Sequence, residues 1–247
     1  LVKEDGHKYA SLFPGEAGAH IDAMPAWAPS GFCVAFASTR EKTSGSSLWI
    51  LSLRKDAKPV RITTGKGSDQ SPVWSPRSDA LVFASDRGGS FALWRVDLVD
   101  GGDGVPRAGR TTKLTHDEGD AVEPAWSRDG KWLVYTLRTG GVSILKIIPA
   151  QGGRAREITV GPSDRTAAWF PDGRHLVYSG SAGAAFDADL MLLEVFAKNG
   201  RLLADAQPKR VSLGDTANGS ELWPAVDGSG RFVFATSEMV VSVDRDA

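Results

Sequence analysis

One short motif occurs five times along the chain, and this repetition restricts the folds open to it more than any other feature. The copies begin at Pro25 (PAWAPSGFCVAFAS), Pro72 (PVWSPRSDALVFAS), Pro124 (PAWSRDGKWLVYTL), Ala167 (AAWFPDGRHLVYSG) and Pro224 (PAVDGSGRFVFATS). Their anchor residues stand 47, 52, 43 and 57 residues apart: Trp27, Trp74, Trp126, Trp169 and Val226. Four copies carry an aromatic residue nine positions after the anchor: Phe36, Phe83, Tyr135 and Tyr178. A fixed internal register at this period indicates a repeated structural module rather than one catalytic turn.

Each copy predicts strand, turn and strand. Pro, Asp, Ser and Gly follow every anchor and reverse the chain, and a run rich in Val, Phe, Tyr and Ala follows the turn. A third strand is expected at 47–53, 92–98, 142–148, 189–195 and 240–246. A more polar fourth strand is expected at 59–65, 111–117, 155–161 and 209–215. Helix signals are nearly absent, and DLMLLEV (189–195) fits the third strand better than a helix.

Four short strands per repeat, at a period of roughly 40–50 residues, are typical of a β-propeller blade. The sequence therefore predicts an all-β fold, a single propeller domain over 1–247 built from four-stranded antiparallel blades, with five repeats visible. A blade cannot bury both faces alone, so the anchors and aromatic residues are expected to pack between neighbouring blades. Two ways to complete the ring stay open. A strand at 8–13 completes the last blade and gives five blades, or a further blade lies outside the sequence and gives six.

Composition and charge exclude several functional classes. The formal net charge is −1, so no overall field attracts nucleic acid or an anionic membrane. No apolar run approaches the roughly 20 residues of a membrane-spanning helix. Cys33 is the single cysteine, which excludes a disulfide framework and a thiolate metal cluster. No phosphate-binding loop or other motif predicts a cofactor.

The motif resembles the repeat of the TolB-like propellers, which runs roughly D-x-x-P-x-W-S-P-D-G, a strand, then S-D-R-x-G. The second copy is the most similar, with Asp69, Pro72 and Trp74 followed by Ser85-Asp86-Arg87-Gly88-Gly89. The Arg after the strand recurs as Arg40, Arg87 and Arg138. The resemblance covers nearly the whole chain and implies the fold. It implies a periplasmic or extracellular location and several functions, because the family includes partner-binding propellers and the non-catalytic propellers of prolyl-oligopeptidase-type peptidases.

Acidic residues at the start of each innermost strand are the one polar set that follows the repeat: Asp22, Asp69, Asp120, Asp164 and Glu221. One interpretation is that they converge at one mouth of the channel, where they form a weak cation site or an anionic rim for a basic peptide. The alternative is local. Each acid bonds backbone N–H groups or the repeated Arg and holds its own turn in place.

Catalytic patterns are weak. His20 and His116 fall in corresponding connections before an innermost strand and form a weak candidate pair of metal ligands, and the favoured alternative is two exposed loop histidines. No Gly-x-Ser-x-Gly nucleophile elbow is present. The favoured function is therefore a non-catalytic scaffold that binds a protein or peptide at a face or channel mouth. The alternatives are the gating or docking propeller of a larger hydrolase, and a metal-dependent enzyme at the channel mouth.

Overall fold

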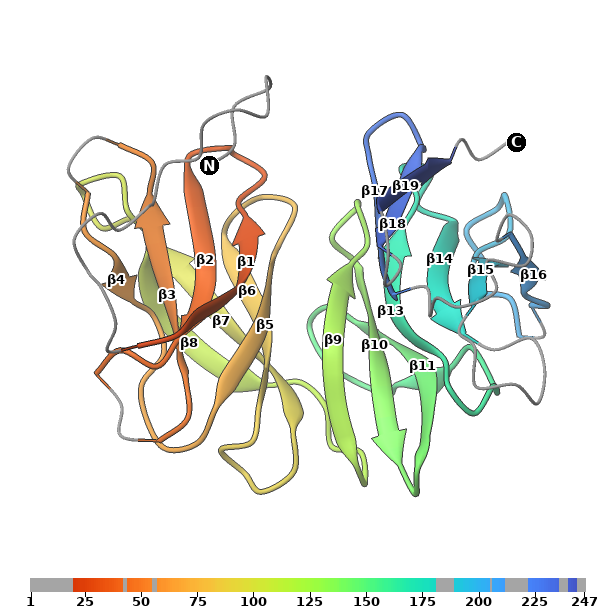
Figure 1. The fold of residues 1–247 in the computed structure, drawn as a ribbon, viewed down its shortest axis with the longest axis horizontal. Coiled ribbons are helices and arrows are strands. Elements are labelled where there is room, and N and C mark those ends of the chain that lie inside the picture. The colour runs from red at the N-terminus through yellow and green to blue at the C-terminus, as the bar shows by residue number, and fades with distance from the viewer. Residues whose placement is uncertain are drawn as a thin grey trace.

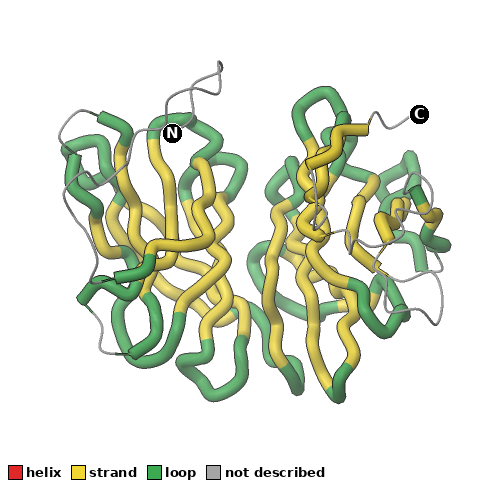
Figure 2. Tube along the Cα trace, viewed as in Figure 1, coloured by secondary structure: helices red, strands yellow, loops and turns green. Residues whose placement is uncertain are grey.

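The computed structural model describes residues 20–41, 44–54, 57–180, 189–204, 206–211, 222–235 and 240–243. These ranges contain β-strands and no helix, as Figure 2 shows, so the predicted all-β class is confirmed for the described residues. DLMLLEV, the segment weighed between helix and strand, forms a strand over Asp189–Glu194. No helix of the described part is long and apolar enough to cross a membrane.

The strands pair in chain order into antiparallel sheets (Figure 1). Blade 1 contains β1 (Asp22–Trp27), β2 (Cys33–Ser38), β3 (Ser47–Ser52) and β4 (Val60–Arg61). Blade 2 contains β5 (Asp69–Trp74), β6 (Ala80–Ser85), β7 (Ala92–Val99) and β8 (Arg107–Lys113). Blade 3 contains β9 (Asp120–Trp126), β10 (Trp132–Thr139), β11 (Val142–Pro149) and β12 (Arg156–Glu157). Blade 4 contains β13 (Arg165–Trp169), β14 (His175–Gly180), β15 (Asp189–Glu194) and β16 (Lys209–Arg210).

Within the described residues the structure shows four complete blades rather than the five predicted. The fifth repeat forms a three-stranded sheet of β17 (Leu222–Val226), β18 (Phe232–Ala235) and β19 (Val240–Val243). The strand expected to complete it, 8–13, lies outside the described residues, so neither the five-bladed closure nor a sixth blade is supported. Three outer strands, β4, β12 and β16, are shorter than predicted, with two residues each, whereas β8 has seven residues but lies four positions earlier than the predicted 111–117.

The hydrophobic core consists of separate layers, each between two adjacent sheets. Blades 1 and 2 share a cluster in which Leu48 and Ile50 meet Leu81 and Phe83, all of them at 0% exposure. Equivalent clusters join blades 2 and 3, blades 3 and 4, and blade 4 with β17. The strand β6 is buried over its whole length, as expected for a strand covered on both faces. Packing between blades is thus the main source of apolar burial, as the repeat predicted.

The anchor tryptophans show how one blade holds the next. Trp74 is 6% exposed and donates its indole N–H to the carbonyl oxygen of Ala26 in blade 1 at 3.0 Å. Trp169 makes the same contact with Ala125 of blade 3 at 3.3 Å. The prediction that every anchor is buried is wrong for Trp27, which is 53% exposed. No described sheet precedes blade 1, so this indole lacks the neighbouring strand that its counterparts contact.

Candidate functional site

Asp69 forms the most complete of the local contacts expected for the repeated acids. Asp69 is 1% exposed, and its carboxylate accepts a hydrogen bond from Arg87 Nη2 at 2.7 Å. Arg87 Nε donates to Ser85 Oγ at 2.9 Å. The guanidinium lies over the rings of Phe83 and Trp94, at 5.3 Å and 5.0 Å from their centroids. Asp69 therefore ties the start of β5 to the turn that follows β6.

Asp22 makes the same arrangement in blade 1. Its carboxylate bonds Arg40 Nη2 at 2.7 Å, and that guanidinium lies over Phe36 and Trp49. His20 joins this group, since its Nε2 is 3.1 Å from Arg40 Nη2 and 3.4 Å from the Asp22 carboxylate. A histidine in this position is part of the structural network around Arg40.

Blade 3 departs from the pattern. Asp120 accepts a hydrogen bond from the Phe91 N–H of blade 2 at 2.8 Å, and Arg138 pairs with Glu123 instead. Arg138 stands twelve residues after its anchor, whereas Arg40 and Arg87 stand thirteen after theirs. Because side chains alternate along a strand, this shift by one residue turns the guanidinium to the other face. The shift is visible in the sequence, but the other copies have no acid at the position of Glu123, and sequence reasoning missed that residue.

A lysine replaces the missing arginine on the other face of β10. Lys146 Nζ lies 2.6 Å from Asp117 Oδ1, and the Tyr135 hydroxyl donates to Asp117 Oδ2 at 2.7 Å. Burial raises the pKa of the Tyr135 hydroxyl above its ordinary value, and the hydrogen bond to Asp117 raises it further. The repeat gave no sign of Asp117, because the other copies have no acid at its position and have Trp49, Trp94 and Met191 where Lys146 stands.

Asp164 holds the acid position in blade 4, but it differs from Asp22 and Asp69 in its partners. The residue is 3% exposed, and its carboxylate accepts bonds from the Gly161 N–H at 2.9 Å and from the Thr159 side chain. Among the described residues no Lys, Arg or His forms an ion pair with it. Burial raises its pKa above the ordinary value of 3.8, and the two hydrogen bonds offset this only in part.

We expect Asp164→Asn to stabilise the protein at neutral pH. The unfolded chain releases the Asp164 proton near pH 3.8 and the folded chain only at higher pH, so the wild type loses stability as pH rises through that window. Asparagine does not titrate, so the melting temperature of the variant should exceed that of the wild type at pH 7. The difference should vanish below pH 3.8. The other charged or titratable groups around the cavity, Glu157, Tyr178 and Arg210, are present in both proteins, so thermal melts at several pH values isolate Asp164.

The remaining predicted site residues are less informative. Glu221 lies outside the described residues. His116 is exposed, and its predicted pairing with His20 at a metal stays a prediction. Within the described residues no group of three or more His, Cys, Asp and Glu side chains is arranged to hold a metal ion. The convergence of the five acids at one mouth stays a prediction as well.

A cavity of about 330 Å³ lies where the innermost strands of all five sheets meet. Each of these strands contains a bulge three residues before its anchor, with a left-handed residue other than glycine. These residues have φ between 47° and 53°: Met24, Ser71, Glu123, Thr166 and Trp223. All five line the cavity, together with proline in four of the strands: Pro25, Pro72, Pro124 and Pro224. A strained backbone that recurs around one cavity is typical of a functional site held in shape by its surroundings.

The cavity offers apolar surface and few free donors. Met24 and Trp223 are 48% and 64% exposed, although both are large and apolar. Proline has no N–H, so the four prolines supply no hydrogen-bond donor to a ligand. The carboxylate of Glu123 is already engaged by Arg138, by Thr136 Oγ1 at 2.8 Å and by the Thr166 N–H at 3.3 Å. These features suit an apolar group better than a reacting one.

Sequence comparisons connect the chain with a peptidase. It is 27% identical over 205 residues to the uncharacterized peptidase YuxL of Bacillus subtilis. The match covers 66% of this chain and 30% of that protein. A second curated relative, the uncharacterized protein Atu1656 of Agrobacterium fabrum, is also covered over only 30% of its length. The chain therefore spans about a third of the curated relatives that it matches. No protein-family profile matches it.

Solved structures establish the fold. The putative TolB of Agrobacterium tumefaciens superimposes with a TM-score of 0.68 at 20% identity, over 92% of this chain and 72% of that one. A puromycin-hydrolyzing peptidase of Mycobacterium tuberculosis gives a TM-score of 0.65 at 16% identity, over 91% of this chain and 35% of that one. The fold is thus that of the TolB-like propellers, and it also occurs in part of a peptidase.

Proposed function

We propose that this chain is a non-catalytic binding propeller whose central cavity holds an apolar segment of a protein or peptide. One observation carries the proposal: five innermost strands, each with a strained residue, surround one cavity, and the cavity is lined by the exposed side chains of Met24 and Trp223. A volume of about 330 Å³ is at the small end of ligand pockets, so it fits a few side chains rather than a large cofactor. Exposed tryptophan is the residue type that most often dominates binding energy at protein interfaces.

Peptide selection tests this function. A displayed library of random heptapeptides should yield binders rich in apolar residues, and Trp223→Ala should weaken the selected peptide by about thirtyfold, as loss of an interface hot spot does. Trp27→Ala is the matched control, because Trp27 is also exposed but does not line the cavity. Fluorescence polarisation of the labelled peptide gives both affinities. Equal binding by the wild type and Trp223→Ala would show that the cavity is not the site.

A second candidate function is the propeller part of a larger peptidase, and the comparisons favour it specifically. The YuxL and puromycin-hydrolyzing peptidases are both much longer than the portion matched here. In this case the central cavity would admit or orient a peptide substrate, while the chemistry would lie on other residues. The complete reading frame decides the matter. A Gly-x-Ser-x-Gly motif in a flanking α/β domain is expected, and its absence would remove the candidate.

The resemblance to TolB-like propellers also leads us to propose a periplasmic location. Fractionation of cells that express the protein from its own gene would place it in the periplasmic extract. Recovery with the cytoplasmic fraction would contradict this assignment.

A further inference from the structure

The repeat leaves the arginine position of blade 4 without a cation. In blade 2, Arg87 stands thirteen residues after Trp74 and places its guanidinium between Asp69 and two aromatic rings. The corresponding sequence position in blade 4 is Ala182, and the segment 181–188, which lies outside the described residues, contains neither Lys nor Arg. Asp164 therefore has the position of Asp69 without the partner that its own repeat would supply.

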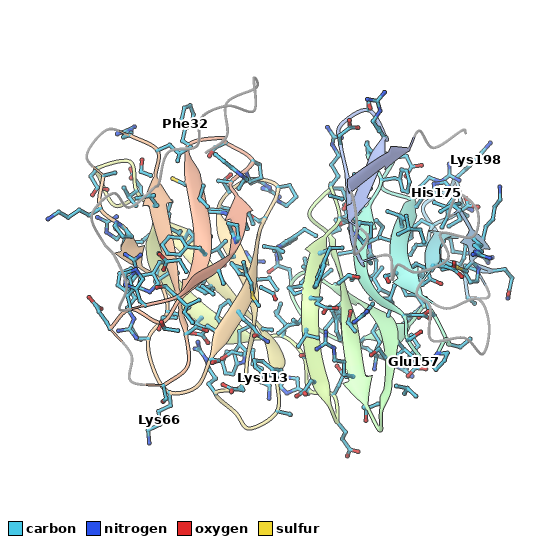
Figure 3. The ribbon with its side chains drawn as sticks, viewed as in Figure 1. Phe32, Lys66, Lys113, Glu157, His175 and Lys198 are labelled. Atoms are coloured by element: carbon cyan, nitrogen blue, oxygen red, sulfur yellow. The ribbon has the colours of Figure 1, made fainter. Side chains whose placement is uncertain are left out.

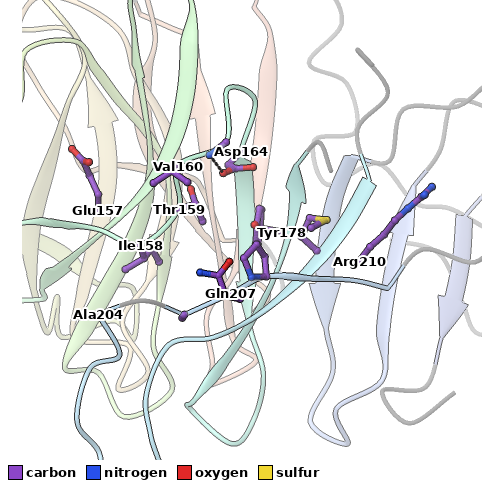
Figure 4. A pocket seen from close by; sticks show the side chains of 13 residues that line it. Glu157, Ile158, Thr159, Val160, Asp164, Tyr178, Ala204, Gln207 and Arg210 are labelled. Atoms are coloured by element: carbon purple, nitrogen blue, oxygen red, sulfur yellow. Dashed lines mark hydrogen bonds between the residues drawn. The ribbon is translucent and has the colours of Figure 1, made fainter. Parts of the chain in front are cut away.

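The surroundings of that missing guanidinium are retained in part, since an aromatic ring remains and methionine replaces the tryptophan. Tyr178 and Met191 face each other across β14 and β15, in the register that Phe83 and Trp94 have in blade 2. Together with Asp164 they line a cavity of about 540 Å³. Figure 4 shows the carboxylate of Asp164 and the ring of Tyr178 among the side chains of this lining. The cavity thus occupies the place that an intramolecular arginine fills in blade 2.

The charges of the lining favour a cation. Glu157 and Asp164 contribute carboxylates, and Arg210 is the one basic residue among the described residues of the lining. Its guanidinium is already paired with Asp189 at 2.8 Å. Glu157, labelled in Figure 3, lies on an outer strand at the exposed edge, whereas Asp164 is 3% exposed. A cationic ligand would therefore meet one acid near the surface and pair with a second one inside.

We infer that this cavity, at the junction of blades 3 and 4, binds a guanidinium group supplied by a ligand. A guanidinium is planar, weakly hydrated and able to stack on a tyrosine while it bonds a carboxylate through two N–H groups. One buried carboxylate does not suffice for a metal ion, which takes several ligands. The site shares no lining residue with the central cavity and goes beyond the function proposed for it.

Calorimetric titration with two arginine-like probes tests the inference. Agmatine represents a free guanidine compound, and N-acetyl-arginine amide represents an arginine within a peptide. Either probe should bind the wild type, and Asp164→Asn should weaken that binding by about tenfold or more, since it removes the paired charge. The stronger of the two probes identifies the source of the guanidinium. N-acetyl-citrulline amide, in which a neutral urea replaces the guanidinium of the arginine probe, should not bind.

Two further variants separate the site from general effects. Asp120→Asn makes the same change at the corresponding acid of blade 3 and should leave the affinity unchanged, because Asp120 does not line this cavity. Tyr178→Leu removes the ring on which the guanidinium is proposed to stack and should also weaken binding of both probes. The inference is overturned if neither probe binds, if N-acetyl-citrulline amide binds as tightly as the arginine probe, or if Asp164→Asn keeps the wild-type affinity.

Discussion

Replacing Phe83 with alanine is expected to lower the free energy of unfolding by about 4 kcal/mol, the range seen when a buried phenylalanine is truncated. Phe83 is 0% exposed and packs in the layer between blades 1 and 2. Its ring also lies beneath the guanidinium of Arg87, so the variant loses a cation–π contact in addition to apolar burial. Urea denaturation followed by circular dichroism measures the change.

Phe32→Ala is the matched control for that experiment. Phe32 is 70% exposed, and Figure 3 shows its side chain at the edge of blade 1. Its removal should alter the free energy of unfolding by no more than about 0.5 kcal/mol. If both variants lost the same stability, the core would not lie between the blades.

The strands and turns could be predicted because each copy of the motif carries its own local signals. Trp74 and Phe83 were predicted to be buried, and they are 6% and 0% exposed. The register was predictable only away from the bulges, because alternating side chains set it and each bulge shifts it. The exposure of Trp27 could not be read from its motif, because burial depends on a neighbouring sheet and not on the residue itself.

The bulges of the central cavity left no trace in the sequence. Their left-handed positions are occupied by residues with nothing in common: Met24, Ser71, Glu123, Thr166 and Trp223. None of these is glycine, and the proline that follows four of them predicts an extended backbone at the preceding residue. Pairing with the second strand of each blade overrides that local preference. The cavity could therefore be found only from the structure.

Replacing Asp69 with asparagine is expected to lower the free energy of unfolding by about 3 kcal/mol, because it leaves a largely buried arginine without its counter-charge. The side chains of Asp69 and Arg87 are 2% and 18% exposed, so water can solvate the remaining cation only in part. Chemical denaturation of the wild type, both single variants and Asp69→Asn with Arg87→Ala gives the coupling energy. Additive losses would mean that the pair does not hold the turn.

The same substitution in blade 4 should have the opposite sign. Asp69 and Asp164 each stand five residues before their anchor tryptophan and are almost fully buried. Asp69 has Arg87 at 2.7 Å, while the described residues give Asp164 only hydrogen bonds from neutral groups. Removing the charge therefore breaks an ion pair in blade 2 and relieves an uncompensated carboxylate in blade 4. Destabilisation by both variants would indicate that Asp164 is a structural pin like Asp69, and that its cavity is not kept for a ligand.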